Sequence, residues 1–155
     1  MTSSDKKSLV DTIVGYRPPP VTKESAINFY APAFGTLNYT FLSLNVMNPR
    51  LLQRIVPKPD LTNTFLFSSC LGSALFIAGR PHLSEAPIKL RIIFSVYGSV
   101  LFNTGSVLTW AIVRSLLPNN SSLATVAGLI SGCLLTGCGI VYLNYNDKAI
   151  KANNK

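Results

Sequence analysis

Three long apolar stretches contain no Asp, Glu, Lys or His. They cover residues 61–78, 92–113 and 122–143. Each approaches the roughly 20 residues with which an α-helix crosses about 30 Å of hydrocarbon. The sequence therefore predicts an integral membrane protein whose fold is all-α, because a helix satisfies its own backbone hydrogen bonds in lipid.

The composition supports this class of protein. The chain has 155 residues, of which 48% are hydrophobic and only 13% are charged, and its mean hydropathy is +0.33. Lys and Arg total 14 against six acids, and these charges flank the apolar stretches. No basic helix or zinc-finger spacing accompanies them, so we expect them to orient the chain and to contact anionic lipids, and we expect no nucleic-acid partner.

The chain divides into three parts. Residues 1–28 form a polar tail that breaks at the prolines of 18–20, residues 29–145 form the membrane helical domain, and residues 146–155 form a charged tail. The proline run is typical of an extended spacer, with a ligand for an aromatic groove as the alternative. The first 20 residues lack the pattern of a cleavable signal or an organellar presequence, so we expect the membrane segments to direct insertion.

The segment 29–47 decides the number of spans. It is uncharged, but Pro32, Gly35 and two asparagines make it a marginal inserter. If it spans, ten Lys and Arg residues lie on the side of both termini and four lie opposite; with three spans the counts are eight and six. The positive-inside rule therefore favours four transmembrane helices with both termini inside, and three helices are the alternative.

Two loops carry basic residues beside the expected spans. The first mixes aliphatic residues with Arg50, Arg54 and Lys58 and is closed by prolines. It is expected to form a short amphipathic turn in the interface, or else a loop that covers the helix ends. In both loops we expect contacts with lipid headgroups, made by Arg50, Arg54, Lys58, Arg80, Lys89 and Arg91.

The last apolar stretch carries the most specific packing pattern. Ala124, Gly128, Gly132 and Thr136 recur every four residues, and the two glycines form a GxxxG motif. Small residues on one helix face let another backbone approach closely. We expect this face to pack inside the bundle or, alternatively, to bind a partner chain or a second copy of this one.

Polar residues inside the apolar stretches form a second pattern. Asn38 and Asn45 are seven apart in the first segment, and Asn103 and Thr104 lie near the middle of the third. An unpaired amide in hydrocarbon is costly, so these side chains are expected to face protein and to tie the first segment to the third. A polar substrate cavity is the alternative explanation.

No constellation of residues indicates a reaction. All six acids lie in the tails and loops, and the single histidine, His82, has only Glu85 close to it in the sequence. The three cysteines lie in apolar segments, where thiols behave as small hydrophobes. We therefore expect no catalytic residues, no metal site and no cofactor.

These observations indicate a class of function rather than an activity. We expect a non-catalytic structural, accessory or assembly subunit of a larger membrane complex, acting through helix–helix and lipid contacts. The alternative is a small oligomeric transporter or channel with a neutral polar pathway, and a lipid-modifying enzyme has less support. The mitochondrial inner membrane is the expected location, with the endoplasmic reticulum as the alternative.

Overall fold

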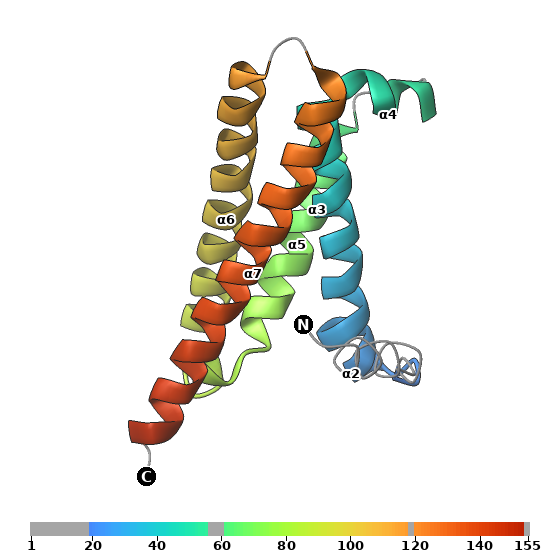
Figure 1. Ribbon diagram of the computed structural model, residues 1–155. Coiled ribbons are helices and arrows are strands. Elements are labelled where there is room, and N and C mark those ends of the chain that lie inside the picture. Colours follow the sequence, from blue (N-terminus) through green and yellow to red (C-terminus); the bar gives the residue numbers. More distant parts are fainter. Residues whose placement is uncertain (1–18, 56–60, 118–119, 154–155) are drawn as a thin grey trace, which may run out of the picture.

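The structure of the chain is a computed structural model that describes residues 19–55, 61–117 and 120–153. Within these ranges all regular structure is helical (Figure 1). The first range holds α2 (Lys23–Ser25), the π-helix η1 (Ala26–Tyr30), α3 (Ala31–Met47) and α4 (Pro49–Ile55). The others hold α5 (Thr62–Ala78), the 3-10 helix η2 (Pro81–Leu83), α6 (Ile88–Leu116) and α7 (Ser121–Asn153).

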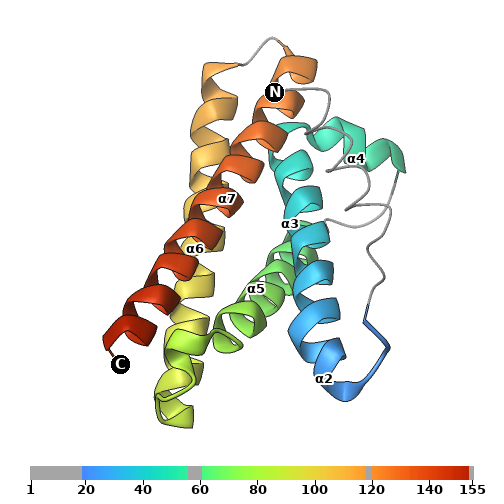
Figure 2. The same ribbon diagram turned by 60° about the horizontal axis from the view of Figure 1, so that its bottom comes forward.

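The long helices α3, α5, α6 and α7 form a bundle in which the chain runs alternately up and down (Figures 1 and 2). One end of the bundle carries α2, the connection from α5 to α6 and the last turns of α7. We call it the termini end. The opposite end carries α4, which points away from the bundle, and the connection from α6 to α7 (Figure 1).

Local chemistry explains where the first helical run begins. Thr22 is the N-cap of α2: its hydroxyl accepts a hydrogen bond from the Ser25 backbone, and the Ser25 hydroxyl accepts one from the Thr22 backbone. This reciprocal capping box satisfies free amides at the helix start. The run continues through η1 into α3, where Pro32 lies in the first turn of α3; Pro32 has no N–H to donate to the preceding turn, and that turn is the π-helix η1.

Two of the helices have the length and composition of membrane spans. They are α6, with 29 residues, and the apolar part of α7 within 121–152. In their most apolar windows only 22% and 11% of the residues are buried. The core helix of a soluble protein would be mostly buried. The shorter α5 is also apolar, with 17 residues.

The helices extend beyond the predicted boundaries at both ends of the chain. Within the described residues, helical structure is present from Lys23, inside the predicted tail 1–28, and α7 continues to Asn153, through most of the predicted tail 146–155. The first predicted loop contains the helix α4. Apolar runs mark only the part of a helix that could lie in lipid, so amphipathic and charged helical turns on either side escape them.

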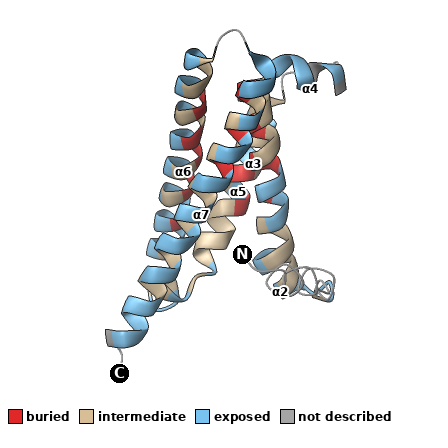
Figure 3. Cartoon of the chain, in the orientation of Figure 1, coloured by how far each residue is buried: buried red, intermediate tan, exposed pale blue. Residues whose placement is uncertain are grey.

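Polar side chains are frequent among the buried residues, and large apolar side chains are frequent among the exposed ones. Among the described residues, the buried side chains include five hydrophobic and seven polar ones. The buried polar residues are Asn38, Ser43, Ser69, Ser95, Ser99, Asn103 and Ser106. Large apolar side chains instead cover the outside: Phe67, for example, is 72% exposed and Val141 68%. The buried residues line the facing sides of the helices (Figure 3).

Candidate functional site

A close backbone contact in the bundle joins two glycines. A Cβ atom placed on Gly35 of α3 would lie 2.6 Å from the Cα of Gly72 on α5. Only residues without side chains allow two helices to cross this closely, because real Cβ atoms do not approach other atoms to that distance. Each glycine is isolated in the sequence, so no spacing motif predicted this contact.

A hydrogen-bond network joins α5 to α6 in the middle of the bundle. The Asn103 amide oxygen accepts from the Ser69 hydroxyl at 2.5 Å, and its Nδ2 donates to the Ser73 hydroxyl and to the Ser99 carbonyl, both at 2.9 Å. Ser99 in turn donates to the Cys70 carbonyl on α5. Asn103 is fully buried, and its amide both accepts and donates hydrogen bonds. The network therefore connects the two helices.

Asn103 bonds to a different helix from the one expected. The amides were expected to join the first segment to the third, but Asn103 bonds to α5. Asn38 donates to the Phe34 carbonyl of its own helix, and Asn45 donates to the Thr62 hydroxyl at the start of α5. Thr104 is exposed and bonds to Val100 of its own helix, because its position next to Asn103 turns it to the opposite face.

An aromatic cluster links α3 and α6 instead. The Tyr39 hydroxyl donates to the Ser106 hydroxyl at 2.9 Å. The Tyr39 ring stacks on Phe102 with centroids 5.2 Å apart and lies 4.9 Å from Trp110. Tyr39 and Trp110 are buried. This cluster fills the centre of the bundle, where the amide pairing was expected.

The small-residue face of α7 packs inside the bundle. Ala124, Gly128 and Gly132 are buried, and Thr136 is partly buried. A Cβ on Gly128 would lie 2.5 Å from Cγ of Met47 on α3, and one on Gly132 would lie 3.5 Å from the Trp110 ring. Within the chain this face is therefore occupied by α3 and α6. Association of α7 with another chain stays a prediction, and it needs a different face.

The predicted headgroup residues lie at both ends of the bundle. Arg50 and Arg54 are exposed on α4, and Lys89 is exposed at the start of α6. Arg91 is partly buried, and its Nε donates to the Ala78 carbonyl at 2.6 Å, which ties the start of α6 to the end of α5. Lys58 lies outside the described residues.

Arg80, the remaining predicted headgroup residue, belongs to a charged cluster at the termini end. Its Nη2 lies 3.0 Å from Asp147 on α7 and also donates to the Asn144 side chain. The backbone N–H of His82 donates to the same carboxylate at 3.0 Å, and the His82 ring Nδ1 lies 2.6 Å from it. An ionised carboxylate only accepts hydrogen bonds, so Nδ1 carries a proton in this contact.

The cluster shifts the titration of Asp147. Burial raises the pKa of this carboxyl, but the hydrogen bonds from the His82 ring and backbone, together with the positive charge of Arg80, outweigh burial. The net effect is a pKa below the ordinary value of 3.8. The charged form therefore holds the α5–α6 connection against α7. The sequence gives no signal for this contact because 65 residues separate His82 from Asp147.

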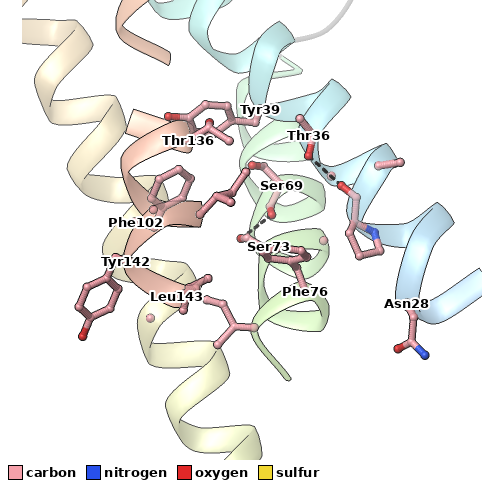
Figure 4. Close-up of a pocket in the computed structure, with 18 of the residues that line it drawn as sticks. Asn28, Thr36, Tyr39, Ser69, Ser73, Phe76, Phe102, Thr136, Tyr142 and Leu143 are labelled. Carbon is pink, nitrogen blue, oxygen red and sulfur yellow. Dashed lines mark hydrogen bonds between the residues drawn. The ribbon is translucent and has the colours of Figure 1, made fainter. Parts of the chain in front are cut away.

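Helices α3 and α7 diverge toward the termini end (Figure 1). A cavity of about 640 Å³ is lined there by residues of α3, α5, α6 and α7 (Figure 4). We call it the α3–α7 groove. Its lining residues run from Tyr39 and Thr136 to Asn28, His82 and Asn146. We call the first end closed, because Tyr39 packs there against Phe102 and Trp110, and we call the other end the mouth. Between them the lining is mainly apolar, with Phe76, Phe94, Phe102, Ile77 and Leu143 among its residues.

Three hydroxyl groups that line the groove are already bonded within the protein. Thr36 donates to the Pro32 carbonyl, Ser73 to the Ser69 carbonyl, and Ser69 to Asn103. The groove thus has few donors to offer a polar substrate. Within the described ranges, no group of three or more His, Cys, Asp or Glu side chains is placed to hold a metal ion.

No protein-family model, no curated protein and no solved structure matches this chain. The arrangement of its residues is therefore the basis for the function proposed below.

Proposed function

We propose that the chain is a four-helix membrane protein that acts as a non-catalytic structural, accessory or assembly subunit of a larger membrane complex. One observation carries the proposal: among the described residues, buried polar side chains outnumber buried hydrophobic ones by seven to five, whereas many large apolar side chains are exposed on the outside of the bundle. In water such a surface would be unstable, because large contiguous apolar patches promote association. In lipid the same surface is solvated, and buried polar pairs hold the helices together.

The face pattern of α6 supports membrane insertion most directly. Its buried residues are Ser95, Ser99, Asn103, Ser106 and Trp110, spaced by three or four positions along one face. Its outer face carries large apolar side chains, including Leu101 and Ile112, which are 53% and 55% exposed. A helix of a soluble domain has the opposite arrangement. With α3 and α5 also crossing, both ends of the described chain lie on one side.

The use of the interior polar groups favours a structural role over a conduit. The buried hydroxyl and amide groups around Asn103 bond to one another, so they contribute to helix association rather than to a free pathway. The α3–α7 groove ends at the Tyr39 cluster and stops short of the opposite end of the bundle. A neutral channel built from Asn38, Asn45 and Asn103 has less support, because these amides bond to separate partners.

We place the proposed subunit in the mitochondrial inner membrane, with the endoplasmic reticulum as the alternative. The support is the sequence: a small, basic chain with several apolar segments is common among organellar membrane subunits. Fractionation of tagged cells tests this location.

Native electrophoresis of membranes in a mild detergent tests the function. We expect the tagged chain to resist carbonate extraction and to migrate in a complex larger than the chain itself, with partners in fixed ratio. Depletion of the chain should lower the amount of assembled complex. A chain that purifies alone and carries a neutral solute across liposomes would instead support the conduit.

A further inference from the structure

We propose that the α3–α7 groove binds one phospholipid, with an acyl chain along the groove and the anionic headgroup at its mouth. The inference rests on the membrane insertion proposed above and names a lipid ligand for the chain. It assigns the ligand to the leaflet on the side of the termini end, because Asn28, His82 and Asn146 line the groove there.

The length of the groove matches one leaflet. Ten residues of α7 separate Thr136 at the closed end from Asn146 at the mouth. They correspond to about 15 Å of helix, which is half of the roughly 30 Å of bilayer hydrocarbon. An acyl chain anchored at the interface ends at this depth. The cavity volume of about 640 Å³ is also typical of sites for single small ligands.

The lining has the chemistry that an acyl chain needs. Apolar side chains dominate the groove, and the hydroxyls of Thr36, Ser69 and Ser73 are bonded inside the protein. A polar ligand at the closed end would therefore lose its water without gaining partners. An acyl chain has no such cost, since it leaves one apolar environment for another.

The mouth has the chemistry that a headgroup needs. Asn28 and Asn146 line it, and their side chains make no hydrogen bond to another described residue, so the side-chain amides are free to donate to phosphate oxygens. The surrounding end of the bundle is basic: its described residues include Lys23, Arg80, Lys89, Arg91, Lys148 and Lys151, against Glu24, Glu85 and Asp147. This excess of positive charge favours an anionic lipid.

A transmembrane helix of a partner fits the groove less well. A helix is about 10 Å across and must continue through both leaflets. The groove instead closes midway, where Tyr39 stacks on Phe102 and lies against Trp110. Beyond that point Met47 fills the space against Gly128. An occupant that ends at mid-depth avoids both obstructions.

Two glycines of α7 provide a matched pair of variants. Gly139 lines the groove, and a Cβ there would make only an ordinary contact, 3.7 Å from Phe102. Gly137 is exposed, and a Cβ there would meet nothing within 4 Å. Gly139→Leu therefore fills the groove, whereas Gly137→Leu adds the same side chain to the same helix outside it. Ala33→Phe on α3 fills the groove from the other wall.

The experiment measures retained lipid by native mass spectrometry. The purified chain is loaded in nanodiscs of phosphatidylcholine and phosphatidylglycerol in equal amounts and is then released into detergent. We expect one retained phospholipid per chain, enriched in phosphatidylglycerol. Retention should fall about tenfold in Gly139→Leu and Ala33→Phe, since lost apolar contacts lower affinity exponentially. Lipid retention should be unchanged in Gly137→Leu and lower in the double variant Asn28→Leu with Asn146→Leu.

Several results would overturn the inference. Equal retention in the wild-type chain and both groove-filling variants would show that lipid binds elsewhere. A dimer or a bound partner that is lost in Gly139→Leu, without retained lipid, would assign the groove to a helix. Solubility of the chain after carbonate extraction would instead overturn the proposed function itself, so the two failures are distinguishable.

Discussion

Gly35 of α3 and Gly72 of α5 touch through their backbones, and a Cβ atom on Gly72 would lie 2.5 Å from the Cα of Gly35. This contact sets how closely the two helices approach. The Asn45–Thr62 hydrogen bond and the stacked pair of Phe41 and Phe65 lie farther along the same interface. Close backbone approach supplies the dispersion energy that apolar burial does not provide in lipid.

The first prediction concerns Gly72→Ala. The added methyl group would overlap backbone atoms of α3, which cannot rotate away, so the helices must separate. We expect a loss of about 1–3 kcal/mol in the free energy of unfolding, the usual cost of overpacking. Unfolding in mixed detergent micelles measures it. Gly105→Ala is the control, because a Cβ there would meet nothing within 4 Å; an equal loss in both variants would contradict the contact.

The second prediction concerns Gly128 and Met47. A Cβ on Gly128 would overlap Cγ of Met47, a flexible side chain. We expect Gly128→Ala to destabilise the bundle by about 1–2 kcal/mol. In the background of Met47→Ala the same substitution should cost less, because the overlapping Cγ atom is gone and only the Cβ atom, at 3.2 Å, is left. A double-mutant cycle with equal costs in both backgrounds would rule out this packing.

The sequence contains enough information to predict the helices but only part of their pairing. Apart from Leu61, which is the N-cap of α5, the apolar stretches 61–78, 92–113 and 122–143 each fall within a single helix, because a run of apolar residues is a local property. The face of α7 formed by Gly128 and Gly132 could also be read from its spacing. The sequence could not show whether this face packs against another chain or against a helix of the same chain, since both kinds of contact use the same small residues.

Contacts between distant residues needed the structure. Burial of Asn103 follows from the cost of an amide in lipid, but its choice of α5 over α3 depends on how the helices rotate about their axes. Thr104 looked equivalent in the sequence and lies on the exposed face. The Gly35–Gly72 contact and the cluster of Arg80, His82 and Asp147 join residues that share no local pattern.

The third prediction separates a structural tie from a polar pathway. Asn103→Leu removes two hydrogen bonds to α5, one accepted from Ser69 and one donated to Ser73. It also removes the bond donated to the Ser99 carbonyl within α6. We expect a loss on the order of 1 kcal/mol in stability, seen as a lower unfolding temperature and lower abundance. Thr104→Leu is the control, because its hydroxyl is exposed. A fully stable Asn103→Leu chain that has lost a transport activity would favour the conduit.

The fourth prediction concerns acid. Because the pKa of Asp147 is lowered in the folded chain, its ionised form contributes stability above the ordinary pKa of 3.8. That contribution is lost as the pH falls below this value through the folded-state pKa. We expect Asp147→Asn to lower the unfolding temperature by a few degrees at about pH 5 and much less at about pH 2. Equal effects at both pH values would show that the charge has no role.

The last prediction tests the proposed topology. The described chain starts at α2 and ends with α7 at the same end of the bundle, and α4 lies at the other end (Figure 1). If α3, α5, α6 and α7 all cross the membrane, exposed positions 24 and 151 face one side and position 50 faces the other. Single cysteines placed as Glu24→Cys, Lys151→Cys and Arg50→Cys report this, after Cys70, Cys133 and Cys138 are replaced by serine.

In sealed vesicles of known orientation, a membrane-impermeant maleimide should label Glu24→Cys and Lys151→Cys together. Arg50→Cys should react only from the opposite side or after permeabilisation. Opposite labelling of Glu24→Cys and Lys151→Cys would mean that α3 does not span, which is the three-helix alternative. In that case the groove between α3 and α7 would have one wall outside the hydrocarbon, and an acyl chain could not occupy it as proposed.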